Sequence, residues 1–128
     1  MWSMGCVLAE LVIGEPLFPG SSSLDQFQKI LEFTGTPSKE TFQNLGVDMG
    51  NSFISELKIK KRPLKDYFKD IDKDIKEIIL KLLEFDPAKR ITALEVLELP
   101  CVQEFRGRSR EDVCKRFIAI DLDDNKRL

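Results

Sequence analysis

The reactive side chains of this chain exclude several common kinds of catalysis. The sequence has no histidine, which excludes a Ser/His/Asp triad, a Cys/His pair and histidine-bound zinc within it. Its three cysteines, Cys6, Cys101 and Cys114, lack the CxxC spacing of a metal or dithiol site. Widely spaced cysteines in odd number are typical of reduced thiols, and we therefore expect a protein of the cytoplasm or the nucleus.

Basic residues form two groups that could bind a partner. The first group, Lys58, Lys60, Lys61 and Arg62, contains no acid and could dock an acidic peptide or a phosphate, although four like charges also occur on solvated faces. The second group lies within residues 106–116. Aromatic residues are not interleaved with the charges of either group, which argues against nucleic-acid binding.

The composition indicates one soluble globular domain of 128 residues. Apolar residues make up 42% of the chain, and 20 basic against 22 acidic side chains leave a formal charge of −2. This balance gives no general attraction to nucleic acid or membranes. The apolar run at residues 1–13 is interrupted by Glu10 and is shorter than the ~20 residues that span a bilayer, so we expect neither a signal peptide nor a membrane anchor.

Helices are predicted in the first third of the chain. Residues 2–13 are apolar on nearly every side, which is typical of a core helix surrounded by protein, and Gly14 and Pro16 end it. Ser23, followed three residues later by Gln26, predicts the capping box of a second helix. The apolar face of this second helix consists of Leu24, Phe27, Ile30 and Leu31.

Further helices are predicted after Gly35, which ends the second helix. A short helical segment reaches about residue 44, and the weak periodicity of residues 45–63 predicts loop and short turns. Residues 72–84 carry the strongest amphipathic pattern of the chain. The apolar positions of this pattern are Ile71, Ile75, Ile78, Ile79, Leu82 and Leu83.

The last predicted helix follows a break at Asp86 and Pro87. Thr92 and Glu95 predict its capping box, and Pro100 is expected to end it. No alternating strand pattern extends beyond a few residues, and no fixed repeat is visible. The predicted fold is therefore all-α.

Three stretches of the sequence resemble the helical C-terminal lobe of eukaryotic protein kinases. They are WSMGC at residues 2–6, GEPLFPG at 14–20 and LLEFDPAKRITALEVL at 82–97. The first is similar to the DxWSxG signature that opens the central helix of that lobe. The resemblance implies a partial C-lobe over residues 1–105 and a polar C-terminal extension over 106–128.

The resemblance can be narrowed to one group of kinases. FPGSSS at residues 18–23 and GTPS at 35–38 are similar to the group of mitogen-activated, cyclin-dependent and glycogen synthase kinases. That group has an insert between two late helices, which would here be the loop-rich stretch at about 35–67. FPGSSSLDQFQKI and the tail IDLDDNKRL look most like mitogen-activated protein kinases.

The resemblance implies structural roles for a few residues, which are Trp2, Gly5, Val7, Leu11, Asp86 and Arg90. The first two would pack the start of the central helix, and the next two would lie at the foot of the apolar column beneath the nucleotide. The arginine, in the motif that the aspartate begins, would form a buried ion pair with the glutamate of an APE motif. Without residues 86–89 before it, Arg90 would ordinarily be interpreted as an exposed charge beside a helix.

The motifs that perform catalysis in this family are not in the sequence. It contains no glycine-rich loop, strand lysine, HRD or DFG motif. ATP and magnesium would therefore bind residues of a full-length parent kinase, and no cofactor is expected to bind this chain. The aspartate of DxWSxG would fall one position before Met1, so we expect the chain to begin at an internal methionine of a longer kinase and to be cut at its other end too.

Two functions remain open from the sequence. In the first, the chain is an inactive part of a serine/threonine protein kinase that supplies scaffold and docking surface, and its partners are the small lobe and activation segment of the parent together with substrates or regulators. In the second, it is a stand-alone, non-catalytic module that binds such partners. An all-apolar helix that lacks its usual cover also leads us to expect marginal stability or self-association of the chain alone.

Overall fold

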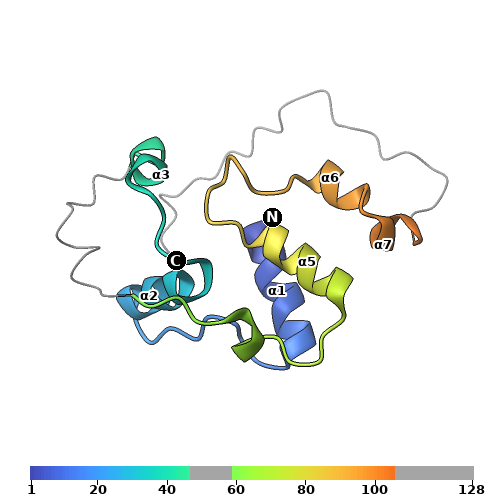
Figure 1. Ribbon diagram of the computed structural model, residues 1–128, viewed down its shortest axis with the longest axis horizontal. Coiled ribbons are helices and arrows are strands. Elements are labelled where there is room, and N and C mark those ends of the chain that lie inside the picture. The colour runs from blue at the N-terminus through green and yellow to red at the C-terminus, as the bar shows by residue number, and fades with distance from the viewer. Residues whose placement is uncertain (47–58, 106–128) are drawn as a thin grey trace, which may run out of the picture.

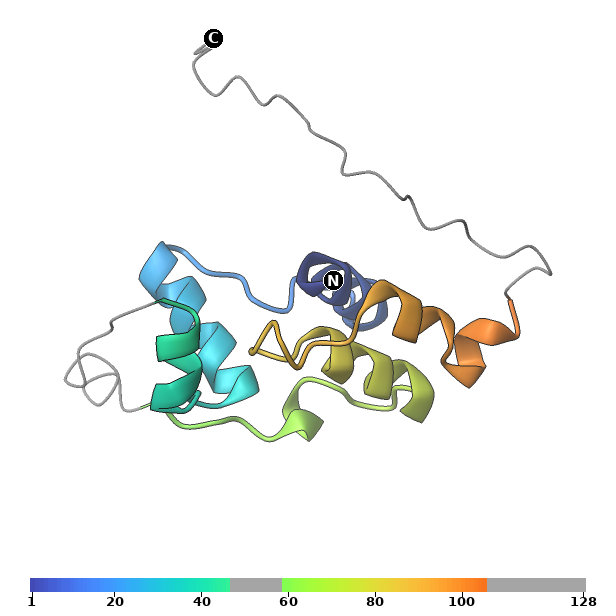
Figure 2. The same ribbon diagram turned by 90° about the horizontal axis from the view of Figure 1, so that it is seen from above.

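The computed structural model describes residues 1–46 and 59–105, and every regular element in these two ranges is helical. α1 and α5 lie side by side at the centre, with α2 and α3 on one side and α6 and α7 on the other (Figure 1), and α1 and α5 remain adjacent when seen from above (Figure 2). The all-α prediction is confirmed for these ranges. The elements are α1 (Trp2–Ile13), α2 (Ser23–Thr34), α3 (Lys39–Asn44), the 3-10 helix η1 (Leu64–Asp66), α5 (Lys73–Leu82), α6 (Ala93–Leu97) and α7 (Pro100–Gln103).

The central pair of helices can approach closely because Gly5 has no side chain. A Cβ atom at this position would lie 2.8 Å from Cβ of Leu82 and 2.9 Å from Cδ2 of Leu83. Both leucines are almost completely buried, at 0% and 2% exposure. Gly5 therefore sets the spacing between α1 and α5, and any larger residue there would separate them.

Helix α5 follows its predicted amphipathic pattern. Asp72 caps its N-terminus, since its carboxylate accepts hydrogen bonds from the backbone N–H groups of Asp74 at 2.8 Å and Ile75 at 3.3 Å. Of the predicted apolar positions, Ile75 lies at the edge with 36% exposure. The buried positions of the face are Ile78, Ile79, Leu82 and Leu83.

The start of α2 differs from the prediction. Ser22 is the N-cap, with an extended backbone (φ −150°, ψ 166°), and its Oγ accepts from the N–H of Asp25 at 3.2 Å. The side chain of Gln26 instead accepts from the N–H of Gly20 at 3.1 Å. The predicted capping box of Ser23 and Gln26 is therefore wrong, because a run of three serines does not reveal which one adopts the extended backbone of an N-cap.

An aromatic cluster connects α2 to the centre of the fold. Phe33 is buried and contacts Phe18, Tyr67 and Phe68 edge-on, with ring centroids 5.5, 5.1 and 6.0 Å apart. The ring of Phe18 also stacks on that of Trp2 at 6.0 Å. Phe33 was not among the predicted apolar positions of α2, although it is the residue that links this helix to α1 and η1.

The buried residues of α2 also differ from the predicted apolar face. Leu24 was predicted to belong to the apolar face, but it is 50% exposed, whereas Leu31 is fully buried. Leu24 lies in the first turn of the helix, and the buried residues lie in its last turns, next to the aromatic cluster. The first turn of α2 is thus left with a half-exposed apolar side chain.

The last two helices show one confirmed and one wrong prediction. Thr92 and Glu95 form the predicted capping box: the N–H of Thr92 donates to Glu95 at 2.7 Å, and the N–H of Glu95 donates to Thr92 Oγ1 at 3.3 Å. Pro100 does not end this helix, which already ends at Leu97. It is the first residue of α7, where its fixed φ and missing N–H fit the first helical turn.

One face of α1 is exposed, as expected for a helix that is apolar on nearly every side but lacks its usual cover in this chain. Met4, Val7 and Leu11 are 51%, 59% and 76% exposed, whereas Ala9 is fully buried against the core. The hydrophobic pattern predicts that such a helix needs cover on this face, and these exposures show that residues 1–46 and 59–105 leave it largely uncovered. None of the helices in residues 1–46 and 59–105 is long and apolar enough to cross a membrane.

Candidate functional site

A tight turn after α5 positions the arginine that the sequence singled out. The carbonyl oxygen of Asp86 accepts from the N–H groups of Lys89 and Arg90, both at 3.0 Å, and its carboxylate accepts from the N–H of Ala88 at 3.0 Å. A 3.4 Å ion pair with Lys89 adds to this turn. Asp86 therefore shapes the backbone that directs Arg90 back toward α5.

The guanidinium of Arg90 connects this turn to both central helices. Nε donates to the carbonyl oxygen of Glu84 at 2.8 Å, and Nη2 donates to that of Phe85 at 3.0 Å. The guanidinium carbon also lies 5.0 Å from the centroid of the Trp2 ring, within cation–π distance. Arg90 thus satisfies two carbonyl groups beyond the end of α5 and holds the first residue of α1.

The positive charge of Arg90 also acts on a nearby thiol. Burial raises the pKa of Cys6, and the positive charge of Arg90 partly offsets this rise. The thiol is thus kept in its neutral form at physiological pH. Cys6 packs against the core as a small apolar residue.

The glutamate that the resemblance implies as the partner of Arg90 would have to come from another segment of polypeptide. Among residues 1–46 and 59–105, no carboxylate forms an ion pair with Arg90. An open groove of about 620 Å³ runs beside it, and its lining includes Lys81, Glu84 and Glu95. Arg90 itself lines this groove, so a carboxylate from further polypeptide would have space to approach the side chain.

The four positions implied on the central helix fall into two pairs. Trp2 and Gly5 lie at the start of α1, one stacked on Phe18 and the other against α5. Val7 and Leu11 point away from the core and are exposed. Their role beneath a nucleotide stays a prediction, since the described residues place nothing over them.

The basic segment expected to dock a partner bonds partly to α2. Lys58 lies outside the described residues, and Lys60 is exposed. Lys61 Nζ donates to the carbonyl oxygen of Thr34 at 3.2 Å. Arg62 forms an ion pair with Glu32 (Nε to Oε2, 3.1 Å), and its N–H donates to the carbonyl oxygen of the same residue at 2.8 Å. The segment is thus fixed beside the end of α2.

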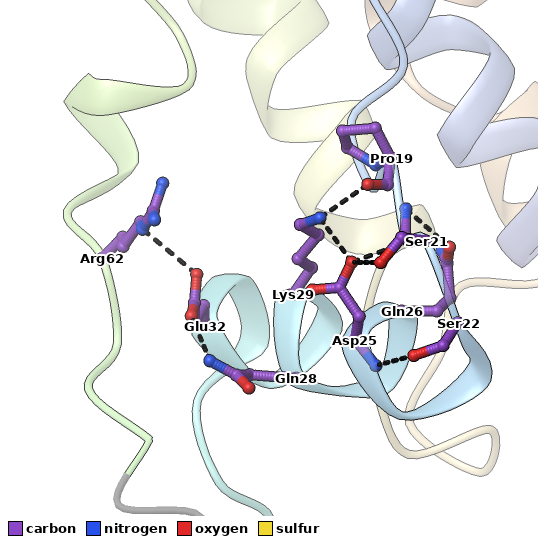
Figure 3. Close-up of polar contacts among 10 residues, drawn as sticks. Pro19, Ser21, Ser22, Asp25, Gln26, Gln28, Lys29, Glu32 and Arg62 are labelled. Carbon is purple, nitrogen blue, oxygen red and sulfur yellow. Dashed lines mark hydrogen bonds and ion pairs between the residues drawn. The ribbon is translucent and has the colours of Figure 1, made fainter.

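A second polar network, not predicted from the sequence, fixes the start of α2. Lys29 Nζ donates to the carbonyl oxygen of Pro19 at 2.6 Å and to the carboxylate of Asp25 at 2.8 Å (Figure 3). The same carboxylate accepts from the N–H and Oγ of Ser21. The hydrogen bonds from Lys29 and Ser21 lower the pKa of Asp25 from 3.8 to about 2. Only the i, i+4 spacing of the ion pair was visible in the sequence.

No group of three or more histidine, cysteine, aspartate or glutamate side chains in residues 1–46 and 59–105 could hold a metal ion. The charged side chains described above hold backbone segments of the chain in place.

Comparison with known proteins supports the interpretation of these elements. Residues 1–102 match the family described as protein kinase domain. Mitogen-activated protein kinase 15 of Xenopus laevis is 35% identical over 130 aligned residues, which cover 100% of this chain and 22% of that protein. Extracellular signal-regulated kinase 2 of Dictyostelium discoideum is 36% identical over 99% of this chain and 35% of its own length.

A third relative gives the same picture. Mitogen-activated protein kinase 12 of Danio rerio is 36% identical over 87% of this chain and 31% of its own length. The chain therefore spans between about a fifth and about a third of the length of these curated relatives.

Proposed function

The chain belongs to the protein kinase domain family, as a relative of the mitogen-activated protein kinases, and we propose from this premise that it forms part of the helical lobe of a serine/threonine protein kinase. In this proposal it supplies scaffold and docking surface. ATP and magnesium bind residues outside the chain, and phosphoryl transfer belongs to the parent protein. The cytoplasm or the nucleus is the proposed location of that parent.

The observation that carries the proposal is the arrangement around Arg90. The side chain is held by two carbonyl groups and by Trp2, yet it opens onto a groove that can admit a carboxylate. The exposed face of α1 likewise fits a helix that is covered by other parts of a kinase. Both features suit a lobe that is completed by further polypeptide.

A chimeric kinase tests this proposal. Residues 1–105 would replace the aligned part of the Dictyostelium discoideum relative, and phosphorylation of a general protein substrate would be measured. We expect the chimera to be active, Arg90→Ala to lower its activity at least about tenfold through loss of a buried ion-pair partner, and Lys89→Ala to leave it unchanged. A chimera that unfolds cooperatively but has no activity would contradict the proposal.

The isolated chain provides the complementary measurement. Calorimetric titration with ATP and magnesium should give no heat of binding, because the glycine-rich loop, HRD and DFG motifs lie outside this sequence. Magnesium-dependent nucleotide binding by the chain alone would contradict the assignment of the ATP site to other residues.

A non-catalytic interaction module is the second candidate function. It is favoured by the surface of α2, where half-exposed Leu24 lies on the same helix that anchors Lys61 and Arg62. The genomic reading frame upstream of the Met1 codon separates the two candidates. An open frame encoding HRD, DFG and APE motifs in that order supports the kinase, whereas an in-frame stop codon supports the module.

A further inference from the structure

A pocket of about 250 Å³ lies where the end of α1, the following turn, α2 and η1 meet. Its apolar walls come from Ile13, Pro16, Leu17 and Pro19, and the ring of Tyr67. The GEPLFPG stretch and Arg62 were noted in the sequence for other reasons, but the pocket itself was not predicted, because its lining combines three separate stretches of the chain. It lies apart from Arg90 and from the exposed face of α1.

The two basic side chains that line the pocket already have partners. Lys29 is held by the carbonyl oxygen of Pro19 and by Asp25, and Arg62 is held by Glu32, as Figure 3 shows. An anionic ligand would thus find both cations paired. It would also face three carboxylates in the same lining.

The acidic side chains of the pocket are less fully paired. Glu15 and Asp66 line it, are exposed, and have no ion pair or side-chain hydrogen bond with any residue of 1–46 and 59–105. With Lys29 and Arg62 already paired, the charge that remains available to a ligand is negative. The pocket is therefore complementary to a cation.

The aromatic wall adds a second feature that suits a cation. Tyr67 is held edge-on against Phe33, with ring centroids 5.1 Å apart, so its ring is fixed in position. Burial raises the pKa of Tyr67, the positive charge of Arg62 partly offsets this rise, and the negative charges of Glu32 and Asp66 add to it. Asp66, the one of these two carboxylates that has no ion pair within residues 1–46 and 59–105, therefore lies within electrostatic reach of the phenol, so a cation in the pocket could meet both the ring and this charge.

We propose that this pocket receives the side chain of an arginine from an extended segment of a partner protein. Arginine fits better than lysine because its planar guanidinium can stack on Tyr67 while its N–H groups reach Glu15 and Asp66, and its methylene groups can lie along the proline walls. The inference rests on the proposed function, since it names the kind of partner that this part of a kinase would dock.

A pair of peptides tests the charge requirement directly. Fluorescein-labelled Ala-Pro-Leu-Arg-Leu-Pro-Ala and its citrulline twin, which keeps the size and planar shape of the side chain but removes the charge and two N–H donors, would be titrated with the full 128-residue chain by fluorescence anisotropy. We expect the citrulline peptide to bind at least about fivefold more weakly, as the loss of partly exposed ion pairs implies. Equal binding of the two peptides, or no saturable binding of the arginine peptide, overturns the proposal.

Variants of the chain locate the site. Glu15→Gln and Asp66→Asn should each weaken the arginine peptide about two- to fivefold. Tyr67→Leu should weaken it as well, whereas Tyr67→Phe keeps the ring and should retain binding. Glu98→Gln, which removes an exposed carboxylate outside the pocket, is the matched control and should change nothing.

A charge reversal separates recognition from general damage to the fold. With Glu15→Lys and Asp66→Lys combined, the chain should prefer a peptide with glutamate in place of the arginine, and thermal melts should match those of the parent chain. A combined variant that still prefers arginine overturns the proposal. Because the chimeric kinase reports activity and not peptide binding, failure here is distinguishable from failure of the proposed function.

Discussion

The guanidinium carbon of Arg90 lies 5.0 Å from the centroid of the Trp2 ring, so the turn after α5 and the first turn of α1 are joined through one side chain. Residues 88 positions apart in the sequence are thereby brought into contact. The same guanidinium satisfies the carbonyl groups of Glu84 and Phe85. Substitution of Arg90 therefore tests directly how much this contact contributes to the packing of the described helices.

Removal of the Arg90 side chain should destabilise the chain. Arg90→Ala loses two charge-assisted hydrogen bonds and the contact with Trp2, and we expect the free energy of unfolding to fall by about 2–3 kcal/mol. Arg90→Lys should cost about half as much, because lysine can replace only part of this geometry. Urea denaturation measures both. Lys89→Ala, which breaks a long ion pair whose lysine is 70% exposed, is the control and should change stability by less than about 0.5 kcal/mol.

A methyl group at Gly5 should separate the central helices. Although alanine favours helix over glycine by about 1 kcal/mol, its Cβ would lie 2.8 Å from Cβ of Leu82. Gly5→Ala should therefore lower stability by a net of about 1–3 kcal/mol. Ser3→Ala, at an exposed position of the same helix, should be neutral or slightly stabilising. Equal melting temperatures for the two variants would show that α1 and α5 are not in close contact in solution.

The exposed face of α1 should make the isolated chain bind hydrophobic dyes and self-associate at micromolar concentration. Val7→Gln combined with Leu11→Gln should reduce dye fluorescence and the apparent mass in analytical ultracentrifugation. The melting temperature should change little, because both side chains are already exposed. Leu94→Gln, at a 53% exposed position on α6, is the matched control. A dilute wild-type chain that is monomeric and binds no dye would contradict this expectation.

The ionised carboxylate of Asp25 should stabilise the folded chain at neutral pH. Its pKa is lowered from 3.8 to about 2, so the stabilisation is present above pH 3.8 and is lost as the pH falls through about 2. Asp25→Asn should therefore be less stable than the parent at pH 7, with the difference shrinking between pH 4 and pH 2. Lys29→Met removes the main cause of the shift and should show the same convergence in urea titrations at a series of pH values.

The N-cap of α2 can be tested with two adjacent serines. Ser22→Ala removes the side-chain acceptor for the N–H of Asp25 and should cost about 1 kcal/mol of stability. Ser23→Ala changes a residue inside the first helical turn and should be nearly neutral. If Ser23→Ala proved the more damaging of the two, the assignment of the N-cap to Ser22 would be wrong.

Local sequence signals predicted much of the fold. The capping box of Thr92 and Glu95 and the amphipathic pattern of α5 involve residues within one or two helical turns, and both were found where the sequence placed them. The Ser22 cap and the position of Pro100 at the start of α7 were missed, because several neighbouring residues could have served equally well. The path of the backbone determines which residue becomes the N-cap or the first helical residue, and tertiary packing sets that path.

The candidate sites depend more strongly on contacts between distant segments. The motif around Arg90 was recognised, but its bonds to Glu84 and Phe85 and its contact with Trp2 were not foreseen. The pocket that contains Glu15 and Asp66 combines three separate stretches of the chain and produces no periodic pattern in the sequence. Sites of this kind can be identified only once the relative positions of the helices are known.

The anchoring of Lys61 and Arg62 on the last turn of α2 has a further consequence for how this region can vary. The chain leaves α2 at Thr34 and returns to the same turn at Lys61, so both ends of the intervening stretch are tied to one place. Once a loop is closed in this way, each doubling of its length adds only about 0.6 kcal/mol of entropic cost. Relatives could therefore differ in the length of this stretch outside α3, which packs on Phe85 through buried Phe42, at little entropic cost.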